Sequence, residues 1–245
     1  MCAITLWTII LIMKLSNKLK QFLATPLNKL SLSIEDSPVE THITRLYREL
    51  DKHEIMFKPA CYLSDEWGCP HQIPLIAIPF YLADAKLSRY EKKFTGVPAE
   101  TNKEIMMYLR HEAGHAFNYG YKLYKTKEWQ TVFGSFDRPY TEHYRRKPYD
   151  KAFVKHLPDY YAQKHPDEDF AETFAVWLTP KSNWKKKYKN TPAAKKLEYV
   201  RRMVEKFGGR SPLKASVKPD WPIESIRITL KEWYRENSNK KQKIK

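Results

Sequence analysis

The segment "TNKEIMMYLRHEAGHAFNYG", residues 101–120, constrains the fold more than any other part of the chain. Thr101 and Glu104 have the spacing of a capping box, which starts a helix, and Gly120 is a typical helix stop. At ~100° per residue, one stripe of this helix is apolar and the opposite side is polar. The apolar stripe comprises Ile105, Leu109, Ala113 and Ala116, and the polar side carries Tyr108, His111, Glu112 and His115. We therefore predict a helix that faces the core on one side and presents two imidazoles and a carboxylate to a cleft.

The pattern His-Glu-Ala-Gly-His at 111–115 indicates a metal site on this helix. His111 and His115 are one helical turn apart, so both imidazoles can reach one ion at Zn–N distances of about 2.0–2.1 Å. Glu112 lies beside them and can accept a proton from water instead of binding the metal. The alternative is that both histidines are hydrogen-bonded core residues, because a motif with three fixed residues also arises by chance. The capped amphipathic helix favours zinc, since that is the context the motif requires.

A catalytic zinc site needs a third protein ligand and one open position. A histidine six residues after His115 is excluded, because Tyr121 stands there. A histidine elsewhere stays open as the ligand, and the candidates are His143, His156 and His165. The other solution is a glutamate on a second helix, with an acid four residues later that accepts the second N–H of a zinc-bound histidine.

The segment "HPDEDFAETFAVWL", residues 165–178, offers such a glutamate. Glu168 and Glu172 are four residues apart on one helical face, so we predict Glu168 as the third ligand and Glu172 as the acid behind His111. Asp169 points about 100° away, and Asp167 faces the helix N-terminus. The alternative is that these acids only complement the helix dipole in the first turn. Glu172 lies past that turn among apolar residues, which favours the metal site.

The rest of the chain predicts a mainly helical α+β fold with a small sheet. Further helices are expected at 39–57, 126–134, 191–209 and 222–237. Residues 73–84 are β-branched and aromatic, but Pro74 and Pro79 lack the N–H of a central strand, which predicts an edge strand beside the 101–120 helix. A zinc-binding domain is expected over 41–210, after a poorly ordered lead at 1–40 and before a basic helix and tail at 211–245.

The positive charge is concentrated in the last quarter of the chain. The net charge is +16, and residues 181–245 alone contain 20 Lys or Arg against 6 Asp or Glu. Such asymmetry predicts contact with nucleic acid or another polyanion through 181–245. The alternative is a solvated surface followed by a disordered tail.

The first thirteen residues, "MCAITLWTIILIM", bear on location. The apolar run from Cys2 to Met13 is shorter than the ~20 residues that cross a bilayer. It has neither a basic start nor a clear cleavage site of a signal peptide. We expect no transmembrane span, a true start near Met13 and a cytoplasmic protein, with a short membrane anchor as the alternative.

The cysteines do not identify a further functional site. Cys61 and Cys69 are expected as free thiols, because no CxxC spacing occurs. A disulfide between them, or a minor metal site with His71, stays open.

Taken with "EWGCPHQIPLIAIPFYLAD" and "KKLEYV", the two helical segments resemble a bacterial family described as putative zinc-binding metallopeptidases, over roughly residues 55–205. The zinc site resembles that of gluzincins, the zincin-like peptidases whose third ligand is Glu, and the second helix resembles the catalytic domain of anthrax lethal factor. The resemblance implies one zinc ion and hydrolysis of a protein or peptide substrate, with Glu112 as general base. It also implies that Tyr161, seven positions before Glu168, donates to the oxyanion. The alternative functions are an anion- or nucleic-acid-binding protein with a structural or inactive metal site, and a protease that its basic arm recruits to nucleic acid.

Overall fold

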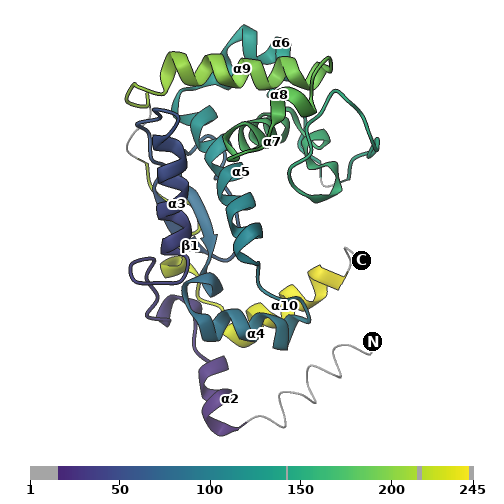
Figure 1. Cartoon of the computed structure of the whole chain (residues 1–245). Helices are drawn as coiled ribbons and strands as arrows, with labels where there is room; N and C mark the ends of the chain where they lie inside the picture. Colours follow the sequence, from purple (N-terminus) through teal and green to yellow (C-terminus); the bar gives the residue numbers. More distant parts are fainter. Residues whose placement is uncertain (1–15, 142, 214–216, 243–245) are drawn as a thin grey trace.

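The computed structural model describes residues 16–141, 143–213 and 217–242, and is mainly helical with a two-stranded sheet, as the sequence predicted (Figure 1). The α-helices are α2 (Asn17–Leu23), α3 (Glu40–Asp51), α4 (Ala85–Thr95), α5 (Asn102–Gly120), α6 (Lys127–Phe133), α7 (Pro166–Leu178), α8 (Trp184–Lys187), α9 (Pro192–Phe207) and α10 (Leu230–Gln242). Short 3-10 turns occupy Leu27–Lys29, Phe80–Ala83, Leu123–Lys125, Pro158–Gln163 and Ile223–Ser225. No helix in the described ranges has the length and apolar character to cross a membrane, and the apolar run at 2–13 lies outside those ranges.

α5 and α7 form the centre of the fold, with α3 along one side of α5 and α9 across the far side of α7 (Figure 1). α5 begins at the predicted capping box, in which Thr101 N–H donates to Glu104 Oε2 at 2.8 Å and Glu104 N–H to Thr101 Oγ1 at 3.3 Å. α7 begins with Pro166 and is buried along its whole length. The two helices are in backbone contact at Gly114, where a Cβ atom would lie 2.9 Å from Ala171 Cα.

A buried ion pair ties α3 to α5 directly before the HEAGH motif. Arg110 Nε donates to Glu49 Oε2 at 2.7 Å, and its Nη2 donates to Oε1 at 2.8 Å. Both residues are buried, so this two-point contact satisfies a charge pair inside the core. It fixes the orientation of α5 relative to α3.

The sheet lies beside α5 and is smaller than the sequence indicated. β1 (Cys61–Ser64) runs parallel to β2 (Ile76–Pro79), and Cys61 pairs with Ile76. The strand predicted at 73–84 is limited to β2, because Pro79 ends the pairing and Phe80–Ala83 turns into a 3-10 helix. β2 is also covered on its other side at Ala77, whose N–H donates to Gly68 O at 2.7 Å. This bridge covers a single residue, so β2 is an edge strand of the two-stranded sheet and lies beside α5, as the sequence predicted.

Both ends of the described chain pack on the core. Leu23 of α2 and Leu27 are buried, although residues 17–29 were expected to be weakly ordered. The helix predicted at 222–237 begins only at Leu230, since Thr229 and Glu232 form a capping box there. α10 packs against α4. The sequence analysis had predicted no helix at the position of α4. The boundaries proposed at 41 and 211 remain predictions.

Candidate metal centre

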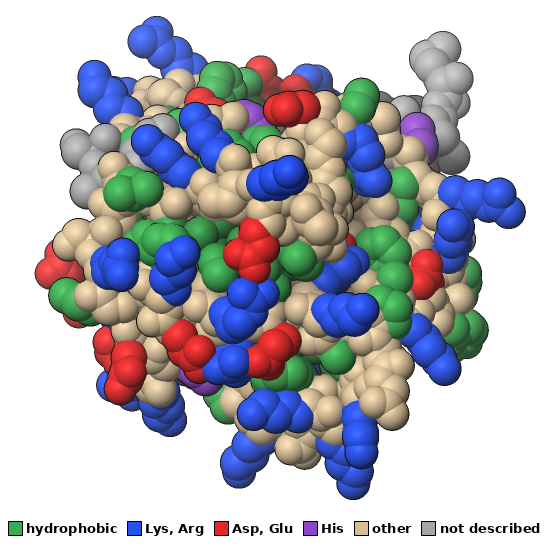
Figure 2. All heavy atoms as spheres, turned by 90° about the horizontal axis from the view of Figure 1, so that it is seen from above, with side chains coloured by type: hydrophobic (Ala, Val, Ile, Leu, Met, Phe, Trp, Pro, Cys, Tyr) green, Lys and Arg blue, Asp and Glu red, His purple; other side chains and the backbone are tan. Residues whose placement is uncertain are grey.

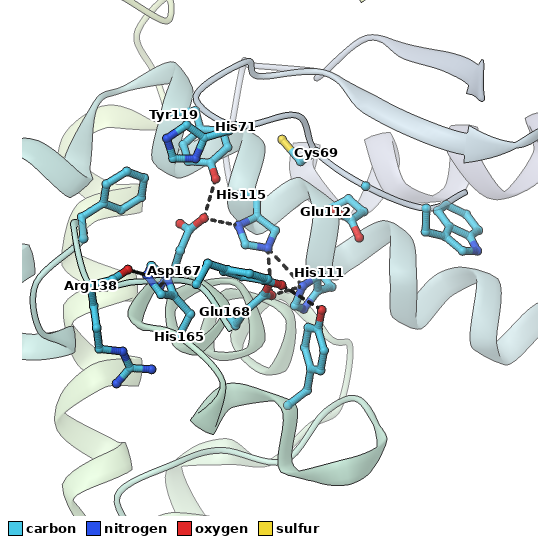
Figure 3. Close-up of a pocket in the computed structure, with 15 residues that line it drawn as sticks. Cys69, His71, His111, Glu112, His115, Tyr119, Arg138, His165, Asp167 and Glu168 are labelled. Atoms are coloured by element: carbon cyan, nitrogen blue, oxygen red, sulfur yellow. Dashed lines mark hydrogen bonds and ion pairs between the residues drawn. The ribbon is translucent and has the colours of Figure 1, made fainter. Parts of the chain in front are cut away.

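Three side chains from α5 and α7 converge on one point (Figure 3). Glu168 Oε2 lies 3.0 Å from His111 Nε2 and 3.1 Å from His115 Nε2, and the two Nε2 atoms are 3.1 Å apart. All three residues are buried. Of the histidines, cysteines and acids in the described ranges, this group alone has the mutual geometry of a metal site.

Glu172, the acid that the sequence analysis placed behind His111, lies against this imidazole. Glu172 Oε1 lies 3.0 Å from His111 Nδ1. The other oxygen, Oε2, accepts the backbone N–H groups of His156 at 3.1 Å and Leu157 at 2.9 Å. Glu172 is fully buried among apolar residues of α7, and both of its oxygens have hydrogen-bond partners, as a buried carboxylate requires.

The position of His115 is fixed by Asp167, which the sequence analysis placed only at the helix N-terminus. Asp167 Oδ2 lies 3.0 Å from His115 Nδ1 and also accepts the hydroxyl of Tyr119. Asp167 Oδ1 accepts Asn118 Nδ2 at 2.8 Å. Each histidine therefore has its own carboxylate. The available signal was Tyr119, one turn after His115, whose hydroxyl needs an acceptor when buried.

This arrangement fits a zinc ion. His111 Nδ1 is hydrogen-bonded to Glu172, and His115 Nδ1 lies 3.0 Å from Asp167 Oδ2 without the alignment of a hydrogen bond. A carboxylate beside each Nδ1 favours the proton of a neutral imidazole on Nδ1, which leaves the Nε2 lone pair facing inward. Two lone pairs and a carboxylate oxygen would then meet within 3.1 Å, which is repulsive unless a cation or protons lie among them. Two imidazoles and one carboxylate are a donor set of catalytic zinc sites.

The pKa values of His111, His115 and Glu168 depend on one another. Burial alone would lower the pKa of His111, but its contacts with Glu168 and Glu172 raise that pKa to about 9. Burial also opposes charge on His115, yet Asp167 and Glu168 raise its pKa well above the usual range. The two histidines hold the pKa of Glu168 well below its usual range despite its burial. The metal-free centre thus balances carboxylates with imidazolium charge.

Glu112 occupies a different position from the three donors. It lines a cavity of about 390 Å³ whose floor contains His111, His115 and Glu168. Its carboxylate makes no hydrogen bond to the described residues, and burial raises its pKa. It therefore faces the space that a substrate or water would occupy instead of sharing the donor point.

Besides Tyr119, the tyrosines Tyr140 and Tyr161 line the same cavity. The ring centroid of Tyr161 lies 5.6 Å from that of His111. The hydroxyl of Tyr140, a residue the sequence analysis did not select, donates to Glu168 Oε1 at 2.6 Å. Nothing in its local sequence marks Tyr140, because it belongs to the long irregular segment between α6 and the turn at Pro158–Gln163.

The alternative ligands do not belong to the metal group, although His165 lines the same cavity. His156 Nε2 contacts Met107 O at 2.9 Å, and His165 Nε2 contacts Arg138 O at 2.8 Å while its Nδ1 accepts Asp167 N–H. His143 is exposed. Cys61 and Cys69 are free thiols, and neither belongs to the metal group, although Cys69 lines the cavity.

The donor set and the open cavity define a protein with a candidate zinc-binding centre. The chain belongs to the family described as putative zinc-binding metallo-peptidase, which matches residues 16–203. The match confirms the resemblance inferred from the two helical segments. No curated protein and no solved structure matched the chain in the same comparisons.

Proposed function

We propose that this protein is a zinc-dependent peptidase of the gluzincin type, with His111, His115 and Glu168 as metal ligands. The observation that carries the proposal is the convergence of these three donor atoms at the floor of a cavity that Glu112 also lines. The family description supports a zinc-binding peptidase in general. The ligand set and the roles below rest on the geometry.

A zinc ion held there would polarise a peptide carbonyl and make an adjacent water more acidic. Glu112 then accepts a proton from the attacking water on its carboxylate and passes it to the leaving amine nitrogen. The raised pKa of Glu112 suits this role, because a base that must also return a proton works best when its pKa approaches the working pH. Glu172 and Asp167 keep the protons of His111 and His115 on Nδ1.

Tyr161 is the proposed hydrogen-bond donor to the carbonyl oxygen as it gains negative charge. Its side chain lines the cavity and lies beside His111. A phenol at the wall of the cavity needs only to turn its hydroxyl from Tyr140 to the carbonyl oxygen as the charge develops.

The decisive experiment combines metal analysis with casein hydrolysis for wild type and Glu112→Gln. The variant keeps all three ligands, so it should retain zinc and the wild-type melting temperature while losing hydrolysis. Glu224→Gln, an exposed carboxylate far along the sequence, is the control and should hydrolyse casein normally. Wild-type hydrolysis by Glu112→Gln would refute the proposed base, and absence of zinc from the wild-type protein would refute the site.

We also propose that residues after 180 contact a polyanion. Figure 2, which looks onto the side of α6 and α9, shows Lys and Arg side chains spread over the face with acids among them. The strongest support is a run of exposed lysines at and around α8, none of which forms an ion pair within the described residues: Lys181, Lys185, Lys186, Lys187 and Lys189. Replacing Lys185, Lys186 and Lys187 by Ala should weaken binding of a DNA oligonucleotide and reduce its salt dependence, since each lost phosphate contact lowers the slope by about 1. The same change at three exposed lysines near α2, Lys18, Lys20 and Lys29, is the control, and equal effects would refute a localised site.

A further inference from the structure

The two oxygens of Glu168 have different partners, and one of those partners is Tyr140. Oε2 faces the Nε2 atoms of His111 and His115 at 3.0 and 3.1 Å. Oε1 accepts the hydroxyl of Tyr140 at 2.6 Å, a length typical of a strong hydrogen bond from a hydroxyl to a carboxylate. The contact therefore distinguishes one oxygen from the other.

Each tyrosine hydroxyl has only one proton to donate, and this determines which hydroxyl is the donor in each contact. A phenol has one proton, and a carboxylate can only accept, so the proton of Tyr140 is committed to Glu168. The hydroxyl of Tyr161 lies 3.3 Å from that of Tyr140, so in this contact Tyr161 is the donor and Tyr140 the acceptor. Tyr140 thus connects the proposed ligand to the proposed oxyanion donor, and the two phenols are not equivalent.

Residues directly before α7 hold Tyr140 in this position. The Lys164 ammonium lies 4.4 Å from the centroid of the Tyr140 ring, and the His165 ring lies 5.4 Å from it. Arg138, two residues before Tyr140, accepts His165 Nε2 at its carbonyl and donates from Nη2 to Lys164 O at 2.5 Å. The segment that carries Tyr140 is therefore fastened to the same element that carries Glu168, although Tyr140 itself is 50% exposed.

We propose that Tyr140 is a positioning residue that makes Glu168 a one-oxygen ligand, by holding Oε1 so that only Oε2 faces the two histidines. The proposal rests on the metal site proposed above. Its consequence is that a position stays open for water or substrate, because a carboxylate that bound through both oxygens would occupy it. Carboxylate ligands depend on such outer hydrogen bonds for their orientation, and the loss of one typically weakens metal binding about 10–100-fold.

The test is metal binding by Tyr140→Phe, which removes one oxygen atom from a half-exposed ring and should leave the fold intact by circular dichroism. We expect its zinc dissociation constant, measured by chelator competition, to rise about tenfold or more. The visible spectrum of the cobalt(II)-loaded protein should also change, because it reports the number and arrangement of ligands.

Tyr144→Phe is the matched control, since Tyr144 is in the same segment but donates to Asp159 O at 2.8 Å. It should keep wild-type zinc affinity and the wild-type cobalt spectrum. Wild-type affinity and spectrum in Tyr140→Phe would overturn the proposal, and so would equal effects in both variants, which would indicate only a loosened segment. Neither measurement requires hydrolysis, so a protein that binds zinc in this way but cleaves nothing would refute the peptidase and leave the role of Tyr140 standing.

Discussion

Replacing Gly114 by Ala tests whether the separation of α5 and α7 determines the metal site. A Cβ atom at 114 would lie 2.9 Å from Ala171 Cα, 3.0 Å from Ala171 O and 3.1 Å from Phe174 Cβ. Carbon atoms in ordinary contact are about 3.5–4.0 Å apart. Two of these three neighbours are backbone atoms, so no side-chain rotation relieves the overlap, and α7 must move by roughly 0.5–1 Å.

Two opposing effects determine how much stability Gly114→Ala loses. Overpacking of a core typically costs about 1–3 kcal/mol, and a clash with backbone belongs in the upper half of that range. Exchange of Gly for Ala in a helix returns about 1 kcal/mol of helix propensity. We therefore expect Gly114→Ala to lower the free energy of unfolding by about 1–2 kcal/mol. Glu168 lies one turn before Ala171, so the same shift moves a ligand away from His115, and we expect zinc affinity to fall about tenfold or more, as for other disturbed ligand shells.

The assay is urea denaturation of metal-free protein together with zinc titration against a chelator. Gly120→Ala is the control on the same helix, because its Cβ would meet the Phe57 ring at 3.3 Å and Pro212 at 3.4 Å, and a ring edge can yield. It should keep wild-type zinc affinity and change stability by less than about 1 kcal/mol. If Gly114→Ala is as stable as wild type and binds zinc as tightly, the close contact at Gly114 does not hold the helices in register.

Three further changes test separate contacts. Glu49→Ala should lower the free energy of unfolding by about 3–5 kcal/mol in urea denaturation, because it leaves a buried guanidinium unpaired. Arg45→Ala, which removes only the exposed partner of Glu49, should cost less than about 1 kcal/mol. Asp167→Asn should weaken zinc binding about 10–100-fold in chelator competition while keeping the fold, and wild-type affinity would show that His115 needs no carboxylate. Tyr161→Phe should lower kcat roughly 10²–10³-fold on a peptide substrate with KM and zinc content nearly unchanged, and a loss within about threefold would exclude it as the oxyanion donor.

The helical part of the site was predictable because helical spacing is local. The i, i+4 relation of His111 and His115, and of Glu168 and Glu172, already places each pair on one face. The two faces are expected to meet, because a catalytic zinc site needs a third protein ligand and a carboxylate behind a histidine. Asp167 was misplaced, because a helix N-terminus offers an acid an adequate local role and conceals its long-range contact with His115.

The irregular segment could not be predicted in the same way. Tyr140 reaches Glu168 only through the path of residues 134–157, which no periodic pattern sets. Strand β1 was missed for a related reason, since four residues give too little alternation to recognise. α4 had recognisable sequence signals that were overlooked, namely Asp84 as its N-cap and Gly96 after its last residue. Gly96 adopts the left-handed conformation there, with φ 77°.

The acid-rich start of α7 requires positive charge, and this leads to a last prediction about the metal-free protein. Buried carboxylates that face one another are unfavourable unless cations or protons lie among them. Without zinc, that charge comes from the histidines, and the pKa of His111 is raised to about 9 from the ordinary 6.5. A raised pKa means that the folded state binds the proton more tightly than the unfolded state, so the stabilisation is complete below pH ~6.5 and is lost as the pH rises through about 9. The melting temperature of chelator-treated protein should therefore fall between these pH values, while that of zinc-loaded protein should fall less, because the metal supplies the charge at either pH. A metal-free melting temperature that is constant or rises over this interval would show that the carboxylates are balanced in some other way.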